Sequence, residues 1–341
     1  MKRNLILILA VALLAPAAFS QKASNSLAGC LLCAPAWTGV PGQPGGDPQG
    51  SAPVDAFLGR WDITVTTPSG EFPSWIEISL RDGKPAIEMV GRSGNAFPVP
   101  RVDIQNDRIE FGAPEGFQGR KNGFLFTGRL EGHRIVGTTD GRDGAPWQWS
   151  AVPVPRLDRG APPGWGQPVP LFDGKDLSNW RPQNPAADNG WSVEEGIMTN
   201  RPPSTNLVSR QQFTDFKLHV EFNCPRNCNS GVYLRGRYEV QIEDDSISEP
   251  PSHHMGGIYG FLAPEPEMPR RPGEWQSFDI TLVGRRVTAV QNGRTIIKDR
   301  EIPGITGSAL DSHEELPGPI YLQGDHGSLS FRNIVVTPAK E

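Results

Sequence analysis

Apolar and polar residues alternate most clearly between Asn229 and Asp245, on both sides of an Arg-Gly-Arg turn. A period of two predicts a β-strand on each side of the turn, because successive side chains of a strand point to opposite faces. One face of this predicted hairpin is apolar and suits a protein core. The other face carries carboxylates, an amide, guanidinium groups and a phenol, contributed by Tyr233, Arg235, Arg237, Glu239, Gln241 and Glu243.

Two interpretations of this polar face stay open. Antiparallel sheets often expose one side to water, so the face can simply be solvated. Alternatively, it is a concave sheet surface that binds a polyhydroxylated ligand, since amides, carboxylates and arginine side chains all hydrogen-bond to hydroxyl groups. We favour the second interpretation.

Short strand-like runs separated by turn residues fill two longer stretches of the chain, and no long stretch has a helical period. The first stretch, residues 56–152, predicts a small antiparallel β-barrel or sandwich. The second, residues 170–339, predicts two packed sheets in a jelly roll, so the fold class is all-β. The predicted strands are 58–65, 74–80, 86–90, 108–111, 123–130, 134–139 and 147–152, then 190–193, 197–200, 206–209, 216–223, 231–234, 238–243, 275–283, 286–291, 295–300, 319–323 and 329–337.

Segments rich in proline and glycine separate these stretches. The chain has 39 Gly and 34 Pro, and residues 21–55 and 153–169 are predicted to be linkers. The Gly59-x-Trp61 start of the first stretch resembles that of lipocalin-like barrels. We expect core positions rather than a ligand platform for its tryptophans, which are Trp61, Trp75, Trp147 and Trp149.

The first 20 residues have the pattern of a secretory signal peptide. Lys2 and Arg3 precede an apolar run over residues 5–14, and Ala-Pro-Ala-Ala-Phe-Ser follows, with a predicted cleavage site after Ser20. We expect an exported protein, periplasmic or extracellular, and the apolar run is too short to span a membrane comfortably. The Leu-Ala-Gly-Cys sequence that ends at Cys30 resembles the lipobox of bacterial lipoproteins, which leaves a lipid anchor at Cys30 open.

The cysteines predict disulfides rather than a metal or redox site, because export favours oxidation. Local pairing of Cys30 with Cys33 and of Cys224 with Cys228 is the simplest connectivity. No strand-helix context supports a redox role for the first pair. A zinc site that joins Cys224 and Cys228 to the histidines at 253 and 254 lacks a paired-ligand spacing and is rejected. The net charge of −5, without a basic block, gives no reason to expect nucleic acid as a partner.

Residues 170–338 contain an ordered series of short motifs. They include Leu171-Phe172-Asp173-Gly174-Lys175, Asn229-Ser230-Gly231-Val232-Tyr233, Tyr238-Glu239-Val240-Gln241-Ile242, Gly257-Ile258-Tyr259-Gly260, Gly273-Glu274-Trp275 and Leu322-Gln323-Gly324-Asp325-His326-Gly327. In this order the motifs resemble the 3-keto-disaccharide hydrolase domain family. The resemblance implies a concanavalin A-like jelly roll that acts on glycosides, and export agrees with such a role. The family usually has Asn where Gln276 stands, and either residue keeps an amide.

The family's name implies chemistry on a sugar that is already oxidised at C3. The ketone acidifies the C2 proton, so a base can remove it, the C1 substituent departs by elimination, and water then adds. This route needs a base, an electrophile for the enolate oxygen and an acid for the leaving group. We expect Glu239 to be the base, with His326 as the second candidate, and Arg235 and His326 to stabilise the oxyanion.

The resemblance also suggests which residues hold the sugar. We expect substrate contacts from Asn229, Tyr233, Gln241, Tyr259, Trp275 and Gln323. No residue is assigned as a metal ligand. A divalent metal as the electrophile stays open, with Glu243, Asp244 and Asp245 as acidic candidates, although nothing in their spacing requires one. His326 can instead cap a turn, and Arg332 beside Asn333 is predicted to form a structural ion pair.

Other functions stay open besides this elimination. Glu239-Val240-Gln241-Ile242-Glu243 is similar to the E-x-D-x-E strand of retaining endoglucanases, which use the two Glu residues as nucleophile and acid/base, but Gln241 stands where the Asp would be. Retaining hydrolysis also needs carboxyl groups about 5–5.5 Å apart. A carbohydrate-binding module without catalysis is the main alternative, and a structural surface protein is the third.

Overall fold

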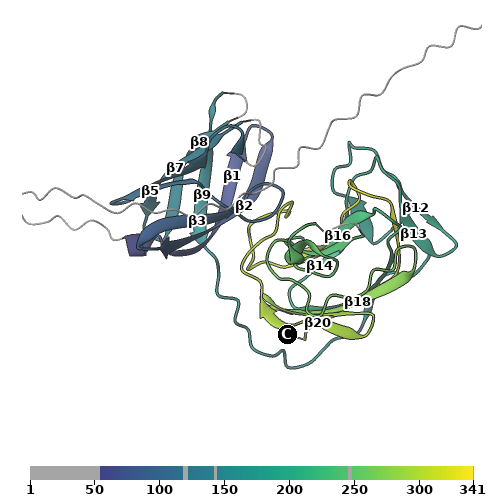
Figure 1. The fold of residues 1–341 in the computed structure, drawn as a ribbon. Helices are drawn as coiled ribbons and strands as arrows, with labels where there is room; N and C mark the ends of the chain where they lie inside the picture. Colours follow the sequence, from purple (N-terminus) through teal and green to yellow (C-terminus); the bar gives the residue numbers. More distant parts are fainter. Residues whose placement is uncertain (1–53, 118–121, 142–143, 245–247, 341) are drawn as a thin grey trace, which may run out of the picture. The chain divides into compact units, whose positions relative to one another are not determined.

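The computed structural model describes residues 54–117, 122–141, 144–244 and 248–340 (Figure 1). The predicted signal peptide, most of the first linker, the lipobox-like Cys30 and the predicted 30–33 disulfide lie outside the described residues. The described residues belong to one compact unit. Within the described ranges, no helix is long and apolar enough to cross a membrane.

A nine-stranded antiparallel sheet forms the barrel region, which we define as residues 54–153. Its strand order is β4-β3-β2-β1-β9-β8-β7-β6-β5, and β3 also contacts β5, so the sheet curls round toward closure. A short 3-10 helix, Val54–Ala56 (η1), precedes it. The strands are β1 (Gly59–Thr67), β2 (Gly70–Arg81), β3 (Lys84–Val90), β4 (Phe97–Pro98), β5 (Arg101–Gln105), β6 (Arg108–Ala113), β7 (Phe124–Glu131), β8 (Arg134–Asp140) and β9 (Pro146–Pro153).

The inside of the barrel region is an apolar core. Trp61 is buried there, and its indole N–H donates to the carbonyl of Phe57 at 2.8 Å. Trp149 is buried as well, as predicted. Trp75 is also buried, but it lies on the outer face of β2. It packs against the apolar core of residues 165–340, with its ring 5.3 Å from that of Phe261. Trp147 is only half-buried.

Two further antiparallel sheets form the jelly-roll region, residues 165–340. The larger sheet has the order β12-β13-β22-β15-β18-β19-β20, with β10 paired to β22, and the smaller has the order β11-β14-β21-β16-β17. The strands are β10 (Val169–Phe172), β11 (Trp180–Pro182), β12 (Trp191–Glu194), β13 (Ile197–Asn200), β14 (Leu207–Phe213), β15 (Phe216–Asn223), β16 (Asn229–Leu234), β17 (Tyr238–Glu243), β18 (Trp275–Val283), β19 (Arg286–Gln291), β20 (Arg294–Glu301), β21 (Gly318–Leu322) and β22 (Leu329–Pro338).

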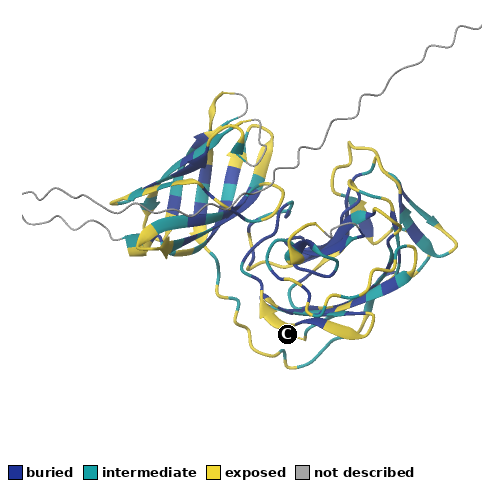
Figure 2. Ribbon diagram, in the orientation of Figure 1, coloured by how far each residue is buried: buried dark blue, intermediate teal, exposed yellow. Residues whose placement is uncertain are grey.

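The main core of the jelly-roll region gathers apolar side chains from both of its sheets, including Val240 and Ile242 of β17 and Phe278 of β18. Figure 2 shows β16 as an almost continuous run of buried positions. A 3-10 helix, Pro251–His253 (η3), follows β17. Cys224 and Cys228 form the predicted disulfide.

The predicted all-β architecture is confirmed, and every predicted strand is present. The structure adds β4, β5, β10 and β11, which are two to five residues long. A run of that length shows too few alternations to stand out in a sequence. Between β9 and β10 the chain makes one isolated bridge, Trp165 with Ala339.

Two buried carboxyl groups meet where β1 packs against the jelly-roll region. Asp62 and Glu314 are buried, and Thr64 Oγ1 lies 2.6 Å from Ser312 Oγ beside them. Burial is the largest cause that raises the pKa of each carboxyl, and the charge of Glu314 raises the pKa of Asp62 further. Arg285, with Nε 3.7 Å from Glu314 Oε2, supports one negative charge on Glu314. Asp62 is therefore the protonated member of the pair.

We expect replacement of Asp62 by Asn to flatten part of the pH dependence of stability. The Asp62 carboxyl has a raised pKa when folded but an ordinary one of roughly 3.9 when unfolded. Stability is therefore full at low pH and falls as pH rises above that value, by up to about 1.4 kcal/mol per pH unit. Thermal unfolding from pH 4 to 9 should show Asp62→Asn melting above the wild type at pH 8, with the gap closing toward pH 4. Asp103→Asn, on exposed β5, is the control, and an equal pH dependence in wild type and Asp62→Asn would contradict the assignment.

Candidate active site

The predicted hairpin is present, and its polar face lies on the smaller sheet of the jelly-roll region. β16 and β17 pair so that Tyr233 is opposite Glu239 and Gly231 is opposite Gln241. β21 lies on the other side of β16, with Tyr321 opposite Tyr233. Three strands therefore bring their polar side chains to one surface.

Glu239 is the central group of this surface. Its side chain lies over Gly231, where a Cβ atom would collide with the carboxyl group. Only glycine leaves room for the carboxyl at that place, which explains the Gly in the Asn-Ser-Gly-Val-Tyr motif. The hydroxyl of Tyr233 lies 2.8 Å from Glu239 Oε2 and 3.0 Å from the carbonyl oxygen of Gly307. Glu239 is 4% exposed.

The environment of Glu239 favours its protonated form. Burial is the largest effect and raises the pKa of Glu239 to about 8, although the Tyr233 hydrogen bond and the charge of His326 act in the opposite direction. At neutral pH the protonated carboxyl can donate to the Tyr233 oxygen, while Tyr233 donates to Gly307. The Glu239 carboxyl and the Tyr233 hydroxyl then each have a hydrogen-bond partner. A carboxyl with this pKa can gain or lose a proton near neutral pH, as acid-base catalysis requires.

His326 and Asp325 form an ion pair after the end of β21. His326 Nδ1 lies 2.7 Å from Asp325 Oδ1, and this hydrogen bond is the main cause that raises the pKa of His326 and lowers that of Asp325. The imidazole side chain is 51% exposed. Its charge acts on Glu239, so the two groups are close enough to influence each other's protonation. The His326–Asp325 pair therefore supplies a second group that can bind and release a proton, in addition to the Glu239 carboxyl.

Two buried amides on the same surface have oxygen atoms without a hydrogen-bond partner in the described part of the chain. Gln241 uses its amide nitrogen to donate to Glu243 Oε2 at 2.9 Å, and its amide oxygen is unpaired. The amide oxygen of Gln323 is unpaired too. An unpaired buried acceptor costs free energy unless a ligand or water donates to it. These oxygens are therefore suited to sugar hydroxyl groups.

Tyr259 and Asn229 lie at the margins of this surface. The Tyr259 backbone N–H donates to the carbonyl of Glu239 at 3.0 Å, and its ring stacks on His253 at 4.4 Å. Burial, followed by the charge of Glu239, raises the pKa of Tyr259 to about 12, so its hydroxyl remains neutral. Asn229 is half-buried opposite Glu243.

The prediction that Arg235 shares a surface with Glu239 is wrong. Arg235 and Gly236 both have positive φ and form the tight turn between β16 and β17, so the alternation of the strand ends at Leu234. The Arg235 guanidinium is fully buried, and its Nη2 donates to the Tyr238 hydroxyl at 3.0 Å and to the Gly284 carbonyl at 2.8 Å. It has no contact with the carboxyl of Glu239.

Trp275 does not reach this surface either. It lies on β18 of the larger sheet, where the neighbouring positions Gln276 and Phe278 point to the core and Trp275 points away from it. The Arg332 guanidinium covers its ring at 4.1 Å, and Arg332 Nε donates to Glu221 Oε2 at 2.5 Å. The predicted structural ion pair of Arg332 is confirmed, and Trp275 is part of the same outer cluster.

The sequence reasoning missed three residues that support the site. Tyr321 stacks on Tyr233 with ring centroids 4.2 Å apart, and Asn206 Nδ2 donates to the Tyr321 hydroxyl at 3.0 Å. Gly307 supplies the carbonyl next to Tyr233. Tyr321 is two residues before Gln323, so strand alternation predicts that both lie on the same face of the sheet. No local pattern in the sequence indicates a role for Asn206 or Gly307.

No group of three or more His, Cys, Asp or Glu side chains lies together as a metal site in the residues that the structure describes. Cys224 and Cys228 are joined to each other, which removes both as thiolate ligands. Asp244 accepts the backbone N–H of Asn227. Asp245, the last acidic candidate, lies outside the described residues.

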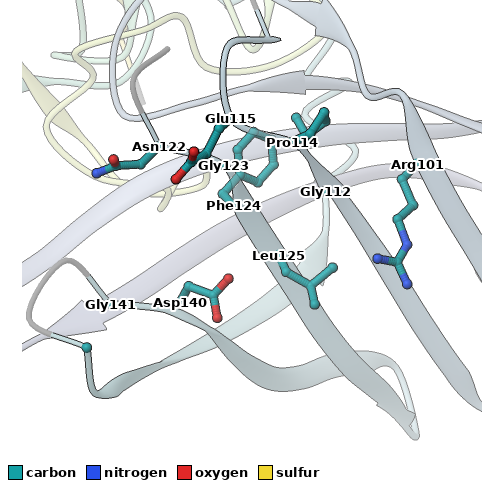
Figure 3. A pocket seen from close by; sticks show the side chains of 12 residues that line it. Arg101, Gly112, Pro114, Glu115, Asn122, Gly123, Phe124, Leu125, Asp140 and Gly141 are labelled. Atoms are coloured by element: carbon teal, nitrogen blue, oxygen red, sulfur yellow. The ribbon is translucent and has the colours of Figure 1, made fainter.

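The cavity in Figure 3 is separate from this surface. It has a volume of about 740 Å³, and all of its lining residues belong to the barrel region, among them Arg101, Glu115 and Asp140. None of the residues expected to bind or transform a sugar lines it. The candidate active site is therefore recognised by its chemical groups and not by cavity size.

Several solved structures resemble this chain. A putative glycosyl hydrolase from Parabacteroides distasonis ATCC 8503 is 30% identical over 53% of this chain and 93% of its own, with a TM-score of 0.43. The carbohydrate binding module CBM66 from Bacillus subtilis is 12% identical over 46% of this chain and 93% of its own, with a TM-score of 0.31. A β-glucanase from Bacillus licheniformis is 12% identical over 52% and 99%, with a TM-score of 0.32.

The sequence comparison with family models matches residues 167–337, which contain the candidate active site, to the 3-keto-alpha-glucoside-1,2-lyase-like domain. No curated protein matches the chain significantly. The matched residues make up half of the chain and include Glu239, Gly231 and His326. The chain therefore belongs to the family of 3-keto-alpha-glucoside-1,2-lyase-like domains.

Proposed function

We propose that the jelly-roll region cleaves 3-keto-glycosides by removing the C2 proton and eliminating the C1 substituent. The observation that carries this proposal is the buried Glu239 carboxyl, with its pKa raised to about 8, beside the His326–Asp325 pair. Membership of the family supports a carbohydrate substrate. The expected signal peptide makes an exported protein part of the same proposal.

The ionised Glu239 carboxylate would act as the base. It takes the C2 proton, and the electrons of the C–H bond move to form an enolate whose oxygen is the former C3 ketone. The C1–O bond then breaks with a proton delivered to the leaving oxygen, and water adds across the new double bond. Tyr233, at 2.8 Å from Glu239 Oε2, can donate to the carboxylate and so help it to ionise.

His326 would supply positive charge to this reaction. Its pKa is raised by Asp325, so the protonated imidazole can face the developing enolate or give its proton to the leaving group. The amide oxygens of Gln241 and Gln323 would accept hydroxyl groups of the sugar. Tyr259 and Asn229 would complete the binding surface at its margins.

Sugar binding without catalysis is the second candidate. The unpaired amide oxygens of Gln241 and Gln323 favour it, because they would serve a binder as well as an enzyme. A binder would not require an acid or a base. The raised pKa of Glu239 would then be only a consequence of its burial.

The first test is incubation of the purified protein with a 3-keto-disaccharide and, separately, with the unoxidised parent sugar. Release of 3-keto-glucose from the oxidised sugar alone is the expected result, because only the ketone acidifies the C2 proton. Parallel reactions with a chelator test the divalent metal. Cleavage of the parent would instead favour double displacement by Glu239 and Glu243, and binding of either sugar without release would favour the binder.

Replacement of Glu239 by Gln should lower kcat/KM for the 3-keto-disaccharide by at least about 100-fold, since an amide cannot take the proton. The wild-type rate should rise as pH rises toward 8, because the base acts only when ionised, and should fall again at higher pH, where His326 loses the proton that the reaction needs. Glu274→Gln, at an exposed carboxyl, is the matched control. A wild-type rate that only falls as pH rises from 6 to 9, with no rising limb, would contradict Glu239 as the base, and unchanged turnover in Glu239→Gln would remove it from the mechanism.

Replacement of Gly231 by Ala should displace the Glu239 carboxyl, because the new methyl group would occupy its place. We expect kcat/KM to fall by about 100-fold, as for other displaced catalytic groups. Gly164→Ala, which meets only the Lys340 side chain, is the control. Circular dichroism should show both variants folded, and full activity in Gly231→Ala would contradict the position assigned to the carboxyl.

A further inference from the structure

A second cavity lies inside the barrel region, at the end of the barrel away from Trp61. Its volume is about 690 Å³, which is within the usual range for small-molecule sites. Trp61 stands near the start of β1, whereas the cavity is reached where β1 ends and β2 begins, close to Ser69 and Phe72.

Strand register shows that the side chains around this cavity point into the barrel. Phe72 is paired with Val65 and Ser74 with Ile63, and both partners are fully buried in the barrel core. Phe126 of β7 and Trp147 of β9 both pair with Thr139 of β8. Paired residues share a face of a sheet, so residues from four strands converge on one interior space.

Aromatic rings form most of the apolar wall. Phe72 and Trp147 meet edge to face with ring centroids 6.3 Å apart, and Phe124 and Phe126 do so at 6.0 Å. The Arg92 guanidinium lies 5.6 Å from the Phe72 ring. A wall of this kind suits a flat, apolar or aromatic molecule, because rings pack well against other rings in edge-to-face or offset geometry.

One polar atom in this wall lacks a partner. The indole N–H of Trp147 is inaccessible to solvent, and no acceptor lies within hydrogen-bond distance of it among the described residues. The other interior tryptophans are satisfied, Trp61 by the carbonyl of Phe57 at 2.8 Å and Trp149 by the carbonyls of Thr127 and Thr138 at 3.1 Å. A buried donor without a partner costs free energy, which an acceptor atom of a ligand would recover.

We propose that this cavity binds a small aromatic molecule that carries an oxygen acceptor for the Trp147 N–H. The rings of Phe72 and Phe126 hold its flat part, and Arg92, one of two charged residues in the lining, can pair with a negative group. The other charged residue in the lining is Asp140. This binding is independent of the sugar chemistry proposed for the jelly-roll region.

The test uses anilinonaphthalene sulfonate as the probe, an aromatic molecule with sulfonate oxygen acceptors whose fluorescence rises in apolar sites. Titration of the whole protein should show saturable binding of one probe per chain. Trp147→Phe keeps a ring but removes the donor, and should weaken binding about fivefold. Trp165→Phe makes the same change outside the cavity and should leave the affinity unchanged.

Two further variants sharpen the result. Thr139→Phe places a ring in the cavity and should abolish saturable binding, with cooperative thermal unfolding as the check that it is folded. Glu239→Gln should bind the probe as the wild type does, which separates this site from the proposed active site. The proposal is overturned if the wild type shows no saturable binding, or if Trp147→Phe binds the probe as tightly as Trp165→Phe does.

Discussion

The burial of one carboxyl group over a glycine is the constraint on which the candidate active site depends. Glu239 can lie across Gly231 only because that residue has no side chain, and the pairing of β16 with β17 brings the two strands together at this point. Burial there raises the pKa of the carboxyl to about 8. A group that would be ionised on the surface is thereby made able to exchange a proton near neutral pH.

The barrel region and the candidate active site are joined through one loop. Gly307 offers its carbonyl to the Tyr233 hydroxyl, which also contacts Glu239, and the next residue, Ser308, donates its N–H to the carbonyl of Arg92 in the barrel region at 2.9 Å. The loop that contains Gly307 and Ser308 therefore bonds to the candidate active site through Tyr233 and to the barrel region through Arg92. The barrel region thus contributes to the position of the groups around Glu239, in addition to the cavity that it contains.

Local sequence patterns predicted the strands well and the site in part. Tyr233, Glu239 and Gln241 share a face, as the alternation indicated. Trp275 was assigned wrongly although a signal existed, since it has the same phase as Ser277 and Asp279, polar residues on the outer face of β18. The buried Gln276, which accepts from Gln291 Nε2 at 3.1 Å, obscured that phase by placing a polar residue on the core side.

The sequence by itself determined the all-β class, the strands, the Cys224–Cys228 disulfide and the resemblance to a family, because each depends on neighbouring residues or on motifs read in order. The tertiary structure alone decided that Arg235 turns into the core and that His326 lies close enough to act on Glu239. It also decided the pKa of Glu239 and the interior cavity beside Trp147. Those features depend on which strands pack together and on contacts between residues far apart in the chain, whereas alternation along one strand gives only the face on which a side chain lies.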